Sequence, residues 1–271
     1  MVFISMGMQL AIIFFSLLPV LIYSFVIYLT VPYKTIKFKE ALPYIVVGFL
    51  SVGLLEAFWD MYPEWHNVTT NIMGPPIINP LKYFHVYYFV QVALIEELAK
   101  LSIFILFERV RSRFKKTPDH PLSTMFFVGM VSLGFAVIEN IHYGSMSPDP
   151  MDTLWWRSIT AVIGHMVFGL FMGYWISMGR MGARFYDRSL FDIIINKRKR
   201  LRNIIYTFIG LIAATILHGI YDLHIELNGP VGLTTLYMLL IMSLLGVFWC
   251  FKNLNKLYNK KVEYIRKKVD L

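Results

Sequence analysis

Glu96, Glu97 and Lys100 interrupt a long apolar stretch of the chain at positions three and four residues apart. This spacing places side chains on one face of a helix. Of two neighbouring carboxyl groups beside an ammonium, one can act as a general base or acid on a water molecule. The other carboxyl group or the lysine then compensates its charge. The segment is therefore the first candidate for chemistry.

Three further apolar segments carry a carboxyl group, an imidazole or both. Glu139 follows Phe135 by four residues, Asp222 follows His218 by four, and His165 shares its segment with Arg157. Asp222 can orient or charge the imidazole of His218 across one helical turn, and imidazoles can bind a water or donate to a developing oxyanion. Ionisable groups inside a bilayer are costly, are usually functional and pair with one another. We therefore expect these segments to share one polar centre.

The composition points to a membrane protein. Hydrophobic types make up 57% of the 271 residues and charged types only 16%, against about 25% charged in a soluble domain. The 22 Phe, 16 Tyr and 6 Trp demand burial and exclude a disordered chain. A single cysteine, Cys250, excludes an intramolecular disulfide and a cysteine-ligated zinc site. The fold class that remains is an all-α integral membrane protein.

Seven stretches are apolar enough for a membrane-spanning helix, which needs about 20 residues. They are residues 9–31, 41–60, 81–108, 122–143, 155–179, 203–226 and 231–251. We expect one polytopic domain over residues 1–271, with the catalytic helices at about 81–226.

Basic residues set the expected orientation. Nearly all of the 26 Lys and Arg lie after the first, third and fifth spans or in the C-terminal tail. The positive-inside rule then places the N-terminus outside and the C-terminus inside, so no nucleic-acid partner is needed to explain the charge. On this topology the polar residues lie in the outer half or the middle of the bilayer. Residues 184–200 alternate basic and apolar types and are typical of a helix on the inner leaflet.

Four sequence motifs resemble those of one protease family. The segment Ile95-Glu96-Glu97-Leu98-Ala99-Lys100 resembles the Glu-Glu-x-x-Lys motif of the PrsW intramembrane proteases, with Ile95 where a further glutamate is often found. Phe135, Glu139 and Asn140 match a Phe-x-x-x-Glu-Asn motif. A third motif supplies a histidine where His165 lies, and His218-Gly-Ile-Tyr-Asp222 resembles a His-x-x-x-Asp motif. The four motifs occur in the family's order over about residues 80–226.

The resemblance implies an intramembrane endopeptidase of the cell membrane that uses a glutamate-activated water. The substrate would be a membrane-anchored protein, such as an anti-sigma factor, cut near the extracytoplasmic side. The implied catalytic residues are Glu96, Glu97, Glu139, His165, His218 and Asp222, supported by Lys100, Phe135 and Asn140. The similar CAAX prenyl proteases have a histidine where this chain has Glu139, so cleavage of a prenylated protein is the less expected activity.

Several alternatives stay open at the level of sequence. The chain is also similar in topology to the seven-span scaffold subunit of γ-secretase, although a scaffold does not need the glutamate pair. A proton-coupled transporter is disfavoured, because no inverted repeat is seen. We expect no metal cofactor; the alternative is zinc held among Glu97, Glu139, His165 and His218, although the chain lacks His-Glu-x-x-His.

Two features outside the motifs also carry expectations. Arg157 either extends to the outer headgroups or anchors a carboxylate such as Glu139. Gly169 and Gly173 have the small-x-x-x-small spacing of a helix contact. Of the partners, the sequence indicates only the lipid bilayer and a protein substrate, and it carries no signal for an oligomeric state.

Overall fold

The computed structural model describes residues 5–30, 37–62, 80–113, 120–181, 199–228 and 233–269, and every element within them is helical. The elements are α1 (Met6–Thr30), the short 3-10 helix η1 (Phe38–Glu40), α2 (Leu42–Met61), α4 (Pro80–Val86), the π-helical segment η3 (Tyr87–Leu94), α5 (Ile95–Arg111), α6 (Pro121–Met146), α7 (Pro150–Ile159), α8 (Ala161–Met181), α10 (Lys199–Asn228) and α11 (Leu233–Val269).

Within these residues, six helical stretches are long and apolar enough to cross a membrane. They are Met6–Thr30, Phe38–Met61, Pro121–Met146, Pro150–Met181, Leu201–Leu227 and Thr234–Glu263. The remaining expected span, residues 81–108, is helical along its whole length as α4, η3 and α5, but its charged residues keep it out of this apolar set. The predicted inner-leaflet segment 184–200 falls almost entirely on residues 182–198, outside the described part of the chain.

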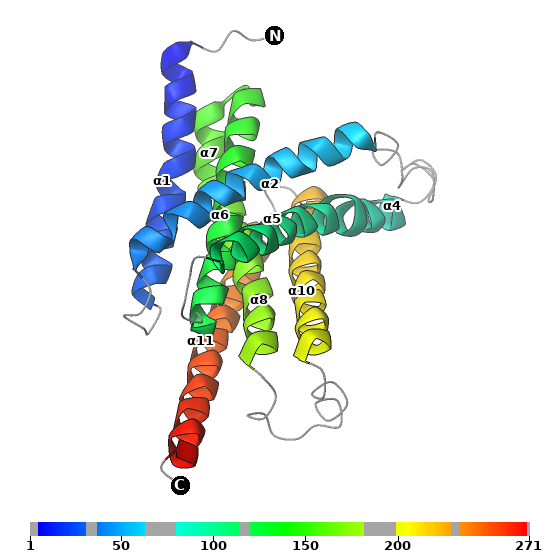
Figure 1. Ribbon diagram of the computed structural model, residues 1–271. Helices are drawn as coiled ribbons and strands as arrows, with labels where there is room; N and C mark the ends of the chain where they lie inside the picture. Colours follow the sequence, from blue (N-terminus) through cyan, green and yellow to red (C-terminus); the bar gives the residue numbers. More distant parts are fainter. Residues whose placement is uncertain are drawn as a thin grey trace.

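Helix α6 lies at the centre of the bundle. In its most apolar stretch 94% of the residues are buried, against 33% in α1 and in α2. Helices α1, α2 and α8 all pack against it. In Figure 1, α2 and α5 run at a steep angle to the upright helices α6, α8 and α10. The two crossing helices contact one another as well as the bundle, so residues of α5 reach the centre from one side.

Small residues permit the closest of these helix contacts. A Cβ atom added to Gly173 of α8 would lie 2.7 Å from the Cα of Met125 on α6, and one added to Gly169 would overlap the side chain of Ser132. The expected role of these two glycines in helix packing is therefore confirmed. Gly219 of α10 leaves similar room for the ring of Phe89 from η3, which a Cβ atom would approach to 2.6 Å.

Two helices depart from regular α geometry close to the polar residues. The π-helical segment η3 directly precedes Glu96, and such segments occur often at functional sites. The second departure is at Thr160, whose backbone angles (φ −122°, ψ −75°) separate α7 from α8. The hydroxyl of Tyr23 on α1 donates to the Ser158 carbonyl oxygen at 3.1 Å, which gives this interrupted turn a partner from another helix.

Candidate functional site

A buried ion pair forms the floor of the site. Lys100 Nζ lies 2.7 Å from Glu97 Oε1 on the same helix, and His218 Nδ1 on α10 lies 3.0 Å from the same oxygen. The side chains of Glu97, Lys100 and His218 are at most 3% exposed. Lys100 Nζ also lies 3.9 Å from the centre of the Phe135 ring, a cation–π contact. Charges buried this deeply are tolerated only when they have such partners.

His165 on α8 joins this pair to α6. Its Nδ1 lies 3.2 Å from Lys100 Nζ, and its Nε2 lies 2.5 Å from Glu139 Oε2. Because an ammonium can only donate hydrogen bonds, Nδ1 accepts from Lys100 and the Nε2–H donates to Glu139. The two contacts together therefore fix the tautomer and the orientation of the imidazole.

Arg157 on α7 anchors Glu139 from the other side. Its Nη2 lies 3.0 Å from Glu139 Oε1, and its Nε donates to Asn140 Oδ1 at 2.8 Å. The guanidinium also stacks 4.0 Å from the centre of the Tyr143 ring. Of the two alternatives for Arg157, the structure shows the carboxylate anchor and not the extension to the headgroups.

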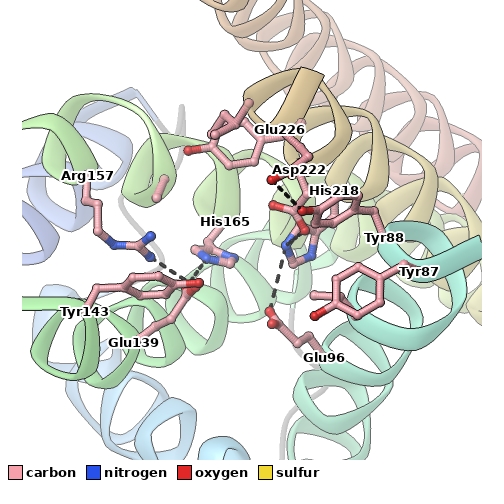
Figure 2. Close-up of a pocket in the computed structure, with 14 residues that line it drawn as sticks. Tyr87, Tyr88, Glu96, Glu139, Tyr143, Arg157, His165, His218, Asp222 and Glu226 are labelled. Carbon is pink, nitrogen blue, oxygen red and sulfur yellow. Dashed lines mark hydrogen bonds and ion pairs between the residues drawn. The ribbon is translucent and has the colours of Figure 1, made fainter. Parts of the chain in front are cut away.

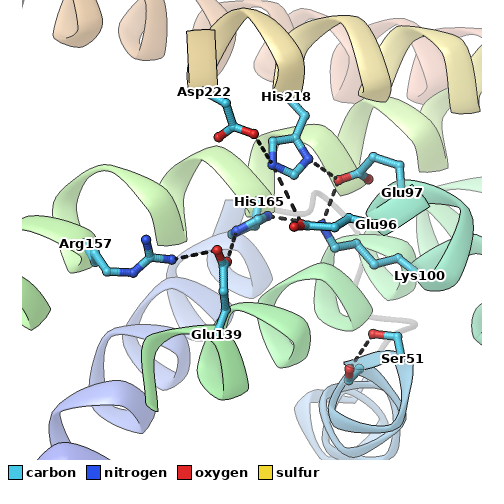
Figure 3. A network of polar contacts seen from close by, with 10 residues as sticks. Ser51, Glu96, Glu97, Lys100, Glu139, Arg157, His165, His218 and Asp222 are labelled. Carbon is cyan, nitrogen blue, oxygen red and sulfur yellow. Dashed lines mark hydrogen bonds and ion pairs between the residues drawn. The ribbon is translucent and has the colours of Figure 1, made fainter. Parts of the chain in front are cut away.

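Glu96 lies between Lys100 and His218 in the network (Figure 3). Its Oε2 is 3.5 Å from Lys100 Nζ and 3.8 Å from His218 Nε2, and Asp222 Oδ2 is 3.3 Å from the same imidazole nitrogen. This Glu96 oxygen is buried and has no hydrogen-bond partner within the described residues. Glu97 Oε2 is buried without a partner as well, so access to the cavity described next is what separates the two carboxyl groups.

A cavity of about 310 Å³ opens beside Glu96. Glu139, His165, His218 and Asp222 line it together with Glu96 (Figure 2). Glu97, Lys100, Phe135 and Asn140 are not among the lining residues. The structure thus brings all nine sequence-predicted residues together and divides them into a group that faces the cavity and a group that supports it.

The walls of this cavity include residues that the sequence did not indicate. Tyr87, Tyr88, Tyr143 and Tyr221 line it, and Tyr88 donates a 2.9 Å hydrogen bond to Glu226 at its rim. The spacing of Glu226, four residues after Asp222, is the one signal that placed it on the same helix face. The tyrosines carry no comparable signal, because tyrosine is equally common at the ends of membrane spans.

The residues fit a catalytic metal only in part. Glu96, His165 and His218 each offer one ligand atom, and these atoms lie within 4.8 Å of one another. One carboxylate and two imidazoles is a donor set that zinc accepts, with a water in the fourth position. However, both ring nitrogens of His165 are already engaged, by Lys100 and by Glu139. In this arrangement Glu96, His165 and His218 do not form a three-ligand metal site, because His165 has no ring nitrogen free to bind a metal.

This group also differs from the expected zinc alternative. Glu96 takes part in place of Glu97 and Glu139. Glu97 instead pairs with Lys100 and His218, and Glu139 pairs with Arg157 and His165.

The helical bundle and the site define a class: membrane-embedded proteins with a carboxylate–imidazole centre inside the bundle. The sequence model of one such family, described as "PrsW family intramembrane metalloprotease", matches residues 47–248. The chain belongs to this PrsW family, and it is a multi-pass membrane protein and an intramembrane protease.

Three curated bacterial relatives are each named "Protease PrsW". The chain is 25% identical to the one from Geobacillus kaustophilus over 68% of this chain and 67% of the relative. It is 24% identical to the one from Oceanobacillus iheyensis (59% and 70% covered) and 27% identical to the one from Clostridioides difficile (66% and 69% covered). No solved structure gives a significant match.

Proposed function

We propose that this protein hydrolyses a peptide bond of a membrane-anchored protein with a water that Glu96 activates. The observation that carries the proposal is the position of Glu96. Its Oε2 is buried and free of hydrogen bonds within the described residues, and the side chain lines the cavity. A general base must lie within hydrogen-bond reach of the water it deprotonates, and Glu97, wholly buried behind the cavity, has no such access.

The other residues of the site have distinct roles in this proposal. Glu96 takes a proton from the water as its oxygen attacks the peptide carbonyl carbon. His218 donates to the carbonyl oxygen and stabilises the negative charge that develops there, and Asp222 orients the imidazole through its 3.3 Å contact with Nε2. When the C–N bond breaks, Glu96 returns the proton to the leaving amine. Glu97 and Lys100 hold the local charge balance, and Glu97 orients His218 through the 3.0 Å contact to Nδ1.

The cavity also bears on the alternatives. A scaffold without activity needs neither a free carboxylate nor a space beside it, and both are present. The substrate class, a membrane-anchored regulator such as an anti-sigma factor, rests on the resemblance to PrsW proteases alone. Glu139, engaged by Arg157 and His165, stands where the CAAX proteases have a histidine, and this disfavours a prenylated substrate.

We further propose seven spans, with the N-terminus outside and the cavity near the outer face. One end of the bundle carries the basic residues Lys39, Arg109, Arg111 and Arg180. There Glu108 of α5 contacts Tyr44 of α2, Arg111 of α5 and Arg180 of α8. Arg180 in turn contacts Thr124 of α6. Glu139 and Arg157 lie towards the opposite ends of their helices.

In a Cys250→Ala background, a cysteine at Met146 should react with an impermeant thiol reagent in intact cells. A cysteine at Ser112 should react only after the cells are opened, and the reverse pattern would overturn the orientation.

The activity is tested with purified protein in proteoliposomes that contain a panel of single-span substrates. The wild type should cut at least one substrate on the side of the cavity. Glu96→Gln keeps the size of the side chain but cannot accept a proton, so it should leave the same substrate intact at equal protein level. A Glu96→Gln variant that cuts at the wild-type rate would disprove the mechanism.

Zinc is the second candidate for activating the water, and the cluster of Glu96, His165 and His218 is the observation that favours it. When bound, the ion would lower the pKa of its water and polarise the peptide carbonyl. We expect activity to survive exhaustive chelation, with well under one zinc per chain by elemental analysis. One zinc per chain, together with chelator-sensitive activity that zinc restores, would favour the metal mechanism instead.

A further inference from the structure

Arg157 lies outside all four sequence motifs, yet it contacts two residues of the second one. Its Nη2 is 3.0 Å from Glu139 Oε1, and its Nε donates to Asn140 Oδ1 at 2.8 Å. Both partners lie on α6, whereas Arg157 lies on α7. The side chain is 17% exposed, so the ion pair is shielded from most of the screening that weakens surface pairs.

We propose that Arg157 is a positioning residue of the reaction, which acts through Glu139 to hold His165 in place. This inference rests on the proposed function. The two oxygens of Glu139 are divided between the two neighbours: Oε1 faces Arg157 and Oε2 faces the Nε2–H of His165. The guanidinium thus fixes the carboxylate, and the carboxylate fixes the imidazole whose Nδ1 faces Lys100.

The backbone supports this arrangement. Residues eight apart in a straight helix lie about 12 Å apart along its axis, but Arg157 and His165 contact the same carboxylate. The interruption at Thr160 separates the two helices that carry them, and the long arginine side chain spans the remaining distance. Tyr23 stabilises the interrupted turn by its hydrogen bond to the Ser158 carbonyl oxygen.

Electrostatics extends the effect of Arg157 to Glu96. Without the guanidinium, the closest other cation to the Glu139–His165 pair among the described residues is Lys100, which lies 3.2 Å from His165 Nδ1. Lys100 Nζ also pairs with Glu97 Oε1 at 2.7 Å and with Glu96 Oε2 at 3.5 Å. An uncompensated Glu139 would draw the ammonium towards itself and weaken its hold on the glutamate pair.

Lysine cannot replace the arginine fully. Arg157 uses two nitrogens of a planar fork on two acceptors, and its face stacks on Tyr143 at 4.0 Å. An ammonium supplies the charge but neither the fork nor the stacking. A lysine at this position should therefore restore part of the function that a neutral side chain loses.

The test is a double-mutant cycle in the proteoliposome assay. Arg157→Met should lower kcat at least 30-fold and change KM less than threefold, and Arg157→Lys should fall between Arg157→Met and the wild type. If Arg157 acts through Glu139, then adding Arg157→Met to Glu139→Gln should cause no further loss of kcat. The matched control is Arg180→Met, because Arg180 likewise joins a glutamate and a polar side chain, Glu108 and Thr124, away from the cavity. It should keep kcat within threefold of wild type.

Thermal unfolding, followed in the same preparations, separates positioning from folding. Arg157→Met leaves Glu139 without its cation and should unfold at a lower temperature, whereas the double variant should recover part of the loss. A full additional loss of kcat on the Glu139→Gln background, or a change confined to KM, would overturn the inference and make Arg157 a substrate-binding residue. If the wild type cuts its substrate and Arg157→Met cuts it equally well, the positioning role fails alone. If the wild type cuts nothing in the panel, the proposed function fails and takes this inference with it.

Discussion

Two clusters of charged residues join the same helices at different depths. The central cluster contains Glu96, Glu97, Lys100, Glu139, Arg157, His165, His218 and Asp222. The end cluster contains Glu108, Arg111, Arg180, Tyr44 and Thr124. Both use residues of α5 and α8, and Glu97 and Glu108 lie about three helical turns apart on α5. In the end cluster, Glu108 accepts hydrogen bonds from Arg111 at 2.8 Å and from Tyr44, and lies 3.4 Å from Arg180.

The two clusters differ in charge balance and in access to solvent. Glu108 faces two arginines, and the exposure of Arg180 reaches 37%. In the central cluster four carboxyl groups share Lys100, Arg157 and two imidazoles, and a cavity lies beside them. Arg111 and Arg180 lie in the last turns of α5 and α8, where a cation stabilises the end of the helix. An excess of buried carboxyl groups costs stability, so we expect it to be retained for function. The comparison therefore contrasts a structural cluster with the proposed catalytic one.

The largest expected difference is in activity. Glu96→Gln should lower the cleavage rate by about 10²–10⁴, the usual contribution of a general base. Glu108→Gln makes the same chemical change on the same helix but away from the cavity, and should keep the rate within about threefold. Both rates are measured in proteoliposomes at equal protein level. Equal losses in the two variants would remove the functional distinction between the clusters.

A second difference is expected in stability. Glu97→Gln leaves the buried ammonium of Lys100 without its shortest partner, and breaking a buried pair costs about 3–5 kcal/mol. The double variant Glu97→Gln, Lys100→Met should regain part of this free energy of unfolding without regaining activity. Arg111→Met in the end cluster should cost about 1 kcal/mol or less. Unfolding in detergent measures all three, and a cost for Arg111→Met as large as that for Glu97→Gln would contradict the contrast.

The smallest expected effect concerns pH at the end of the molecule that carries the end cluster. His120 precedes α6, and its Nδ1 accepts a hydrogen bond from the Leu122 N–H at 3.1 Å. Burial lowers the pKa of His120 to about 4, below its ordinary value of about 6.5. The unfolded chain therefore takes up the proton first as the pH falls, and stability is lost between about pH 6.5 and pH 4.

His120→Asn replaces the accepting ring nitrogen with a side-chain oxygen that can still accept from the N–H groups at the start of α6 but does not titrate. Its melting temperature should fall less than that of the wild type between pH 7 and pH 5, by a few degrees at most. Cleavage at pH 7 should be unchanged. An identical acid sensitivity in both proteins would show that His120 is not the titrating group.

The sequence by itself determined the membrane class and the motif residues of the central cluster. Apolar stretches of about 20 residues specify helices in a bilayer, because the backbone must satisfy its own hydrogen bonds there. The few ionisable residues inside them, among them Glu97, His165 and His218, converge as expected, because each needs a polar partner in an apolar medium. The seven-span count and the orientation, which rest on residues 81–108 and on the basic connections, stay predictions.

Only the tertiary structure decided which residues face the cavity. Glu96 and Glu97 are adjacent and chemically identical, so no sequence pattern separates the free carboxylate from the one that Lys100 and His218 hold. Their difference arises from the direction in which α5 crosses the bundle after the π-helical segment η3. In the same way, the interruption at Thr160 decided that Arg157 anchors Glu139 and does not reach the headgroups. Contacts of this kind depend on the rotation and crossing of whole helices, and these are set by close packing at sites such as Gly173 and Gly219.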